Sequence, residues 1–252
     1  PATFQKSELN MKTFQNKLPA ILSILTLSLL SQQAHAAIAL DRTRVVFDGD
    51  KSSMTVAITN QNKSLPYLAQ SWVEDLNGNK VDSPLAALPP LQRVEPGAKG
   101  QIKIQETGNV SVFPQDRETL FYFNVREIPP KSNKPNTLQL ALQTRVKLFY
   151  RPKSLQIARG DDNEAQKKLT LSHQGDHYVL NNPTGYYVTI VEASGSEKAP
   201  NVSGFKPVMV APKSSVTLNS SAASLGTNPV LTFVNDFGGR PKLVFACSGN
   251  NC

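Results

Sequence analysis

Short segments in which apolar and polar residues alternate recur along the chain after residue 40. In residues 100–104, for example, Ile102 and Ile104 fall on one face and Gln101 and Lys103 on the other. Successive side chains of a β-strand point to opposite faces, so this pattern predicts strands with one buried face. The 18 prolines and 14 glycines favour short strands joined by turns over long helices. The chain is therefore expected to be all-β.

The predicted strands form two groups, separated by a break at Arg151-Pro152-Lys153 and a polar stretch over residues 158–168. The first group comprises residues 43–47, 53–59, 67–74, 100–104, 120–127 and 138–150, with a hairpin at Asn77-Gly78. The second comprises residues 169–171, 178–180, 186–191, 208–210, 216–218, 230–234 and 243–246. About seven short strands in roughly 100 residues are typical of an immunoglobulin-like sandwich. We expect two such domains, residues 37–152 and residues 153–252.

The first 36 residues have the three parts of a secretory signal peptide. A basic stretch with Lys12 and Lys17 precedes an apolar run over residues 20–30, and Ala34-His35-Ala36 has the small-x-small pattern of a cleavage site. The apolar run is shorter than the roughly 20 residues that span a bilayer. We expect export, cleavage near Ala36 and no membrane insertion of the mature chain. Residues 1–10 are interpreted as sequence upstream of a start at Met11.

Two cysteines, Cys247 and Cys252, stand close together near residue 252. Two thiolates are too few for a closed zinc site, which usually takes four ligands. In an exported protein they predict one disulfide that closes a small loop. The formal net charge of +8 comes from scattered Lys and Arg residues rather than from a basic run, so we expect no binding to nucleic acid.

No group of residues in the sequence predicts catalysis. His173 and His177, with Asp176, flank a predicted hairpin turn, where strand geometry does not bring their side chains together on a metal. The sequence has no nucleophile elbow, no phosphate-binding glycine loop and no His-Glu-x-x-His pattern. We therefore expect neither an enzyme nor a bound metal or cofactor.

Residues 137–150 form an unusually long predicted strand. Leu138, Leu140 and Leu142 alternate with Gln139, Ala141 and Gln143, so the leucines share one face. The residues alone leave two interpretations open: leucines in the protein's own core, which general burial preferences favour, or leucines that bind a partner.

Several specific sequence strings point to a known family. They are residues 41–44 (DRTR), 65–70 (LPYLAQ), 89–90 (PP), 93–97 (RVEPG), 120–130 (LFYFNVREIPP), 147–152 (KLFYRP), 182–184 (NPT), 186–189 (YYVT) and 235–241 (NDFGGRP). In this order, and over essentially all of the mature chain, the sequence resembles the PapD-type periplasmic chaperones of pilus assembly. The short loop before residue 138 is similar to the subfamily that serves rod-forming pili.

The resemblance implies two immunoglobulin-like β-sandwich domains arranged at an angle, with a cleft between them. It also implies a periplasmic chaperone that stabilises pilus subunits by lending them a strand, and then delivers them to an outer-membrane usher. Leu138, Leu140 and Leu142 correspond to the lent side chains. Arg44 and Lys147 correspond to cations that hold the C-terminal carboxylate of the subunit.

Three further residues, Glu118, Arg151 and Asp236, correspond to ion pairs that fix the angle between the domains. Lys147 is out of phase with the leucines, so a bulge or a twist is expected between them. An exposed apolar strand is a liability, which leaves self-association of the free chaperone as an expectation.

Two other classes of protein fit parts of the sequence. An immunoglobulin-like pilus or surface subunit would need an N-terminal donor extension, whereas this sequence leads directly into residues 41–44. An exported hydrolase would need a histidine site or a nucleophile motif. The chaperone interpretation is therefore preferred.

Overall fold

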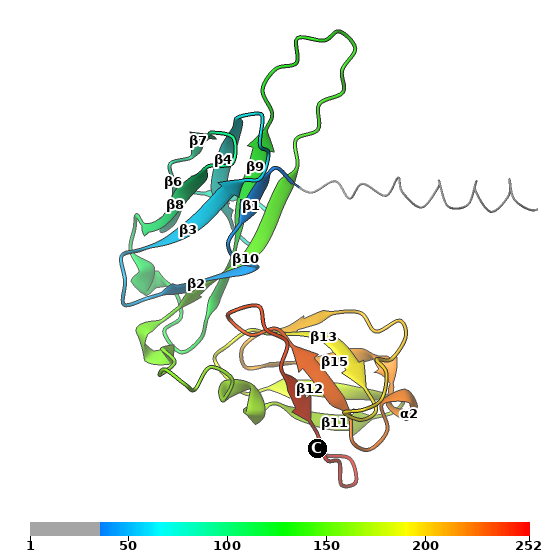
Figure 1. Cartoon of the computed structure of the whole chain (residues 1–252). Coiled ribbons are helices and arrows are strands. Elements are labelled where there is room, and N and C mark those ends of the chain that lie inside the picture. The colour runs from blue at the N-terminus through cyan, green and yellow to red at the C-terminus, as the bar shows by residue number, and fades with distance from the viewer. Residues whose placement is uncertain (1–35) are drawn as a thin grey trace, which may run out of the picture. The chain divides into compact units, whose positions relative to one another are not determined.

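The computed structural model of the protein describes residues 36–252. Up to residue 35, the predicted signal peptide lies outside the described residues. The described part is almost entirely β-structure and forms two sandwiches, each with its own apolar core (Figure 1). The expected all-β class is therefore confirmed. Within residues 36–252, no helix has the length and apolar character needed to cross a membrane.

The first sandwich packs two sheets against each other. One sheet has the order β1 (Ile38–Leu40), β3 (Ser53–Asn60), β8 (Lys99–Glu106) and β6 (Leu85–Leu88). The other has the order β2 (Arg44–Asp48), β10 (Gln143–Arg151), β9 (Thr119–Ile128), β4 (Tyr67–Glu74) and β5 (Lys80–Val81), and β7 (Leu91–Val94) pairs with β4. Alternation in the sequence predicts the buried faces correctly, since Ile102 and Ile104 of β8 are both fully buried.

The second sandwich has a sheet of β11 (Thr170–Gln174), β12 (His177–Asn182) and β15 (Ser214–Ser221). Its other sheet has the order β14 (Val208–Val210), β13 (Val188–Ser194), β16 (Val230–Phe233) and β17 (Lys242–Val244), and a short helix, α2 (Ala222–Leu225), follows β15. Leu171, Leu180, Ile190 and Phe233 lie in the core between the sheets.

Two predictions about strands need correction. The strand expected over residues 138–150 begins only at Gln143, because β9 ends at Ile128 and the described chain offers residues 138–141 no strand to pair with. The strands β1, β6 and β7 are not predicted, because their sequences (IAL, LAAL and LQRV) do not alternate apolar and polar residues. β5 is the second strand of the expected hairpin at Asn77-Gly78, in which Val73 pairs with Val81. The connection between β9 and β10 therefore spans residues 129–142 and is longer than the sequence indicated; Figure 1 shows it projecting beyond the sandwich.

A buried ion network joins the two sandwiches. The Arg151 guanidinium at the end of β10 donates from Nε to Glu118 Oε1 at 2.8 Å and from Nη1 and Nη2 to the Asp236 carboxylate at 2.7 and 3.0 Å. The second oxygen of Glu118 accepts the backbone N–H of Tyr187 at 2.8 Å. Burial opposes the charge on Arg151, but the bonds to Asp236 and Glu118 outweigh it and raise the arginine's pKa. The guanidinium is therefore held in its charged form between the domains.

The C-terminal residues cover the outer edge of β11. The Leu171 N–H donates to the Cys252 carbonyl at 3.2 Å, the Cys252 N–H donates back at 2.8 Å, and the His173 N–H donates to Asn250 at 2.8 Å. A disulfide joins Cys247 to Cys252 and closes this loop. An open strand edge is a template for association with another chain, so the loop protects the second sandwich.

Replacing Cys247 and Cys252 together by serine is expected to lower the free energy of unfolding of the second sandwich by roughly 2 kcal/mol, the loop-entropy value for so short a ring. The measurement is amide hydrogen exchange at Leu171 and His173, whose N–H groups bond to the loop. Dithiothreitol should speed this exchange in the wild type and leave the double variant unchanged. Equal exchange in both proteins without reductant would contradict the prediction.

The Arg151→Met substitution is expected to destabilise the protein by about 3 to 5 kcal/mol, because it leaves the Glu118 carboxylate buried without its cation. Adding Glu118→Gln should recover part of the loss. Urea denaturation provides the measurement. Arg117→Met is the matched control, since it breaks an exposed pair with Asp116 and should barely change the midpoint. Similar losses in the two arginine variants would contradict the buried charge as the cause.

Candidate functional site

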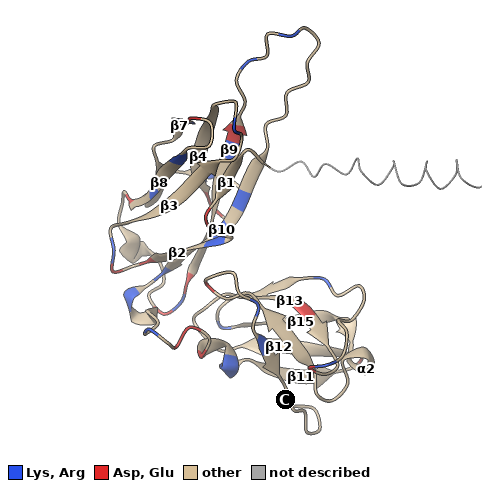
Figure 2. Cartoon of the chain, in the orientation of Figure 1, with Lys and Arg blue, Asp and Glu red and all other residues tan. Residues whose placement is uncertain are grey.

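Arg44 and Lys147 come from neighbouring strands of the first sandwich. β2 and β10 run parallel, and the register places Lys147 directly opposite Arg44 at the point where the pairing begins. Val45 of β2 and Leu148 of β10 are fully buried, so the alternating side chains of Arg44 and Lys147 leave the opposite face of the sheet. The two cations are therefore neighbours on the face away from the core. Figure 2 shows basic residues on both strands.

The second sandwich contacts each cation with one oxygen. Arg44 Nη1 donates to the Val234 carbonyl at 3.0 Å, and Lys147 Nζ donates to the Thr189 hydroxyl at 3.0 Å. Neither cation forms a salt bridge with a carboxylate of residues 36–252. Arg44 Nε is buried and has no hydrogen-bond partner in this part of the chain. The site therefore has hydrogen-bond donors to spare.

Electrostatics at the site favour an anion. Burial lowers the pKa of the Lys147 ammonium, and the adjacent Arg44 lowers it further. Burial also lowers the pKa of Arg44, against the attraction of Asp236 and Glu118. Those two carboxylates are bonded to Arg151. A bound carboxylate would relieve the repulsion between the two half-buried cations, which is the chemistry that this arrangement supports.

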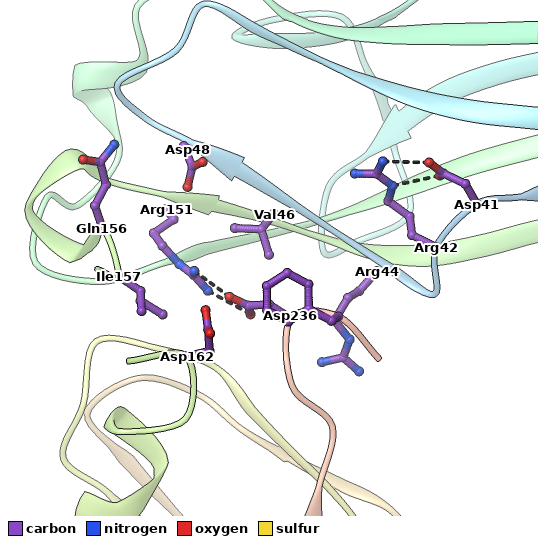
Figure 3. Close-up of a pocket in the computed structure, with 11 residues that line it drawn as sticks. Asp41, Arg42, Arg44, Val46, Asp48, Arg151, Gln156, Ile157, Asp162 and Asp236 are labelled. Atoms are coloured by element: carbon purple, nitrogen blue, oxygen red, sulfur yellow. Dashed lines mark hydrogen bonds and ion pairs between the residues drawn. The ribbon is translucent and has the colours of Figure 1, made fainter. Parts of the chain in front are cut away.

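A cleft of about 660 Å³ lies beside Arg44 and is lined by both sandwiches. Figure 3 shows Arg44 at one side of it, next to the bonded pair Arg151 and Asp236. Asp41 and Arg42 at the rim form their own ion pair, so they add no net charge. The other lining residues are Val46, Asp48, Gln156, Ile157, Asp162 and Phe237.

One edge of β10 is open next to the cations. Within residues 36–252, β9 pairs with β10 from Gln143 to Tyr150, whereas β2 pairs with its other edge only from Lys147 to Arg151. The residues from Gln143 to Val146 therefore present unpaired backbone groups on the β2 side. A strand added there in line with β2 would end at the two cations.

The three leucines of the predicted lent strand precede this open edge and are exposed. The exposed fractions are 83% for Leu138, 64% for Leu140 and 37% for Leu142. The interpretation that they belong to the protein's own core is therefore wrong. The last backbone contact before the strand joins Leu142 to β9, where the Glu127 N–H donates to the Leu142 carbonyl at 2.9 Å.

The bulge expected between the leucines and Lys147 is absent from β10 itself, because its registers with β9 and β2 run without a shift. Even-numbered residues of β10, such as Val146 and Leu148, face the core. If residues 138–142 extended the strand, the even-numbered leucines would lie on the same face as Val146 and Leu148. Lys147 lies on the opposite face. The two kinds of side chain would thus contact a partner on different faces of one strand.

Sequence reasoning missed Thr189 and Val234, the two residues that contact the cations. Each contact joins residues distant in sequence, Lys147 with Thr189 and Arg44 with Val234, and no local pattern marks it. Among the described residues there is no group of three or more metal-binding side chains. His173 and His177 lie on the β11–β12 hairpin as predicted, with Gly175 at a φ of 60° in the turn.

Comparisons with known proteins cover most of the described chain. Residues 37–156 match the N-terminal domain of the pili and flagellar-assembly chaperone PapD, and residues 164–245 match the C-terminal domain of the pili-assembly chaperone PapD. A probable fimbrial chaperone, YfcS of Escherichia coli (strain K12), is 50% identical over 236 residues, which cover 94% of this chain and 93% of YfcS. The chaperone protein PapD of Escherichia coli is 50% identical over 221 residues, 87% of this chain and 90% of PapD.

Solved structures agree with these relatives. The periplasmic chaperone SfaE superposes with a TM-score of 0.67 at 30% identity, covering 83% of this chain and all of SfaE. The SafB chaperone, solved in complex with the SafA pilin of Salmonella enterica, has a TM-score of 0.69 at 25% identity, covering 84% of this chain and 97% of the matched chain. Both family domains are present in order, and the chain belongs to the PapD family of pilus-assembly chaperones.

Proposed function

We propose that this chaperone captures a pilus subunit by pairing a subunit strand with the open edge of β10 and binding the subunit's C-terminal carboxylate with Arg44 and Lys147. The observation that carries the proposal is the register of β2 and β10, which brings both cations to the end of the open edge. The SafB–SafA complex, a chaperone with a pilin, supports a subunit as the partner.

The cations also select the direction of the captured strand. A strand that pairs with residues 143–146 in the same direction as β2 would end at Arg44 and Lys147 with its carboxyl terminus. A strand in the opposite direction would bring an amino-terminal or mid-chain segment to two positive charges, without ionic gain. Charge-assisted hydrogen bonds contribute about 1.5–3 kcal/mol each, so the parallel direction is favoured. Holding the chain end also fixes the register, because a slip of one residue turns every side chain to the other face.

The exposed leucines supply the apolar part of the contact. When residues 138–142 extend β10 along the captured subunit, Leu138, Leu140 and Leu142 share one face and enter the subunit's incomplete core. Complete burial of one leucine contributes roughly 1.5–3 kcal/mol before ordering costs. The strand therefore stabilises the subunit by completing its fold, which is the mode known as strand addition.

The ion network of Arg151 is assigned a positioning role in this function. It connects β10 of the first sandwich to Glu118 and to Asp236 of the second. This contact holds Val234 and Thr189 against the two cations, so the network keeps both domains in place for capture. We further propose that the chain acts in the periplasm after cleavage near Ala36 and passes its subunit to an outer-membrane usher.

Arg44→Ala and Lys147→Ala are each expected to reduce subunit affinity by roughly 10- to 150-fold, since each removes one charge-assisted hydrogen bond to the carboxylate. The measurement is isothermal titration with a peptide of the subunit's last strand, prepared with a free carboxylate and as an amide. Only the free acid should lose affinity. Lys103→Ala, on the exposed face of β8, is the control. Equal losses for the acid and the amide would reject carboxylate binding.

Leu140→Glu is expected to reduce subunit affinity by roughly 10- to 100-fold and to leave the urea midpoint of the free chaperone unchanged, because the leucine is buried only in the complex. The matched control is Val112→Glu, since Val112 is 68% exposed and lies far along the chain from β10. Co-purification from the periplasm and urea denaturation provide the two measurements. Unfolding of the Leu140 variant would show that the leucine stabilises the chaperone itself.

A further inference from the structure

We propose that the Thr189 hydroxyl is a third group that binds the carboxylate of the captured chain, contributed by the second sandwich. This inference rests on the proposed function, since it adds a ligand to the same site. Arg44 and Lys147 both belong to the first sandwich, whereas Thr189 lies on β13 of the second. Carboxylate binding would thus involve both domains.

The position of Thr189 is set by the packing of β13. Its neighbours Val188 and Ile190 are buried in the core of the second sandwich, so the alternating Thr189 side chain leaves on the opposite face. There its hydroxyl meets Lys147 Nζ at 3.0 Å. The residue is 8% exposed, and β-branching restricts its side-chain rotation. The hydroxyl is therefore held in place before any ligand arrives.

The Thr189 hydroxyl has an unused donor. A hydroxyl carries one O–H donor and two acceptor lone pairs. The oxygen accepts a bond from Lys147, and within residues 36–252 the O–H forms no hydrogen bond to any acceptor. A nearly buried donor without an acceptor is unfavourable, and a carboxylate bound to Lys147 would supply one. A carboxylate has about four acceptor positions, enough for Arg44, Lys147 and Thr189 together.

Thr189 is also connected to the group that contacts Arg44. The Val234 N–H donates to the Thr189 carbonyl at 3.0 Å, and the Val234 carbonyl accepts from Arg44 Nη1 at 3.0 Å. This backbone bond therefore links the two residues of the second sandwich that contact the cations, Val234 through its carbonyl and Thr189 through its hydroxyl. Arg44 Nε lies buried at the same place without a partner in the described chain. The donors of this site come from β2, β10 and β13, and within residues 36–252 none of them bonds to a carboxylate.

The test compares Thr189→Val, which keeps the shape and removes the hydroxyl, with Thr189→Ser, which keeps the hydroxyl. The probes are the free-acid and amide peptides of the subunit's last strand. Thr189→Val should lower affinity for the free acid by about 10-fold or more and leave the amide nearly unchanged, whereas Thr189→Ser should stay within about threefold of the wild type. Thr217→Val, at an exposed position of β15, is the control and should have no effect.

A second comparison separates direct binding from positioning of Lys147. In a Lys147→Gln background, NMR titration to millimolar peptide should still detect a loss when Thr189→Val is added, because the hydroxyl binds the carboxylate itself. No further loss would overturn the proposal and leave Thr189 as a positioning residue.

Failure of the inference is distinguishable from failure of the proposed function. If wild-type protein binds acid and amide peptides equally, carboxylate capture is rejected and the role of Thr189 with it. If the wild type prefers the acid and Thr189→Val keeps the same preference, only the role of Thr189 is rejected.

Discussion

The parallel pairing of β2 with β10 is the contact on which the arrangement of the site depends. Because β2 reaches β10 only at Lys147, the preceding residues of β10 have no strand of the described chain on that edge, and Arg44 comes to lie opposite Lys147. One pairing thus produces an open edge and two neighbouring cations at its end. A shift of β2 by one residue would exchange Arg44 for the buried Val45 and remove the charge from the outer face.

Two half-buried cations side by side repel each other, which is unfavourable. The nearby acids of the fold bond elsewhere, so the two cations stay available for an anion. Glu118 and Asp236 are both engaged by Arg151, three hydrogen bonds in all, and so do not pair with Arg44. The second sandwich gives Arg44 and Lys147 only neutral oxygens, from Val234 and Thr189. Neutral acceptors offset part of the desolvation cost without cancelling the charge. A carboxylate of a bound partner would therefore form ionic hydrogen bonds with Arg44 and Lys147 that no acid of the described chain forms.

Sequence patterns were sufficient for the fold class and for the longer strands. β8 shows alternation, with Ile102 and Ile104 on its buried face, whereas the sequences of β1 (IAL), β6 (LAAL) and β7 (LQRV) do not alternate. The start of β10 is at Gln143 rather than at residue 138. The sequence does not predict this difference, because alternation indicates which face a side chain would occupy and not whether a neighbouring strand exists. The contacts of Thr189 and Val234 with the cations depend on how the two sandwiches meet, which no local pattern encodes. Family membership, rather than any missing motif, establishes that the chain is not an enzyme.

Residues 138–142 belong to no strand of the described chain, which suits the reversible capture proposed for them. Ordering the backbone of residues 138–142 costs about 1–2 kcal/mol for each residue, or about 5–10 kcal/mol in total. Burial of Leu138, Leu140 and Leu142 would return about 4.5–9 kcal/mol, so the two contributions nearly cancel. The net affinity in the proposed complex then comes from backbone hydrogen bonds along the open edge and from the carboxylate at its end. A competing strand could replace those backbone bonds one at a time, so the proposed release would need only a strand that completes the subunit better.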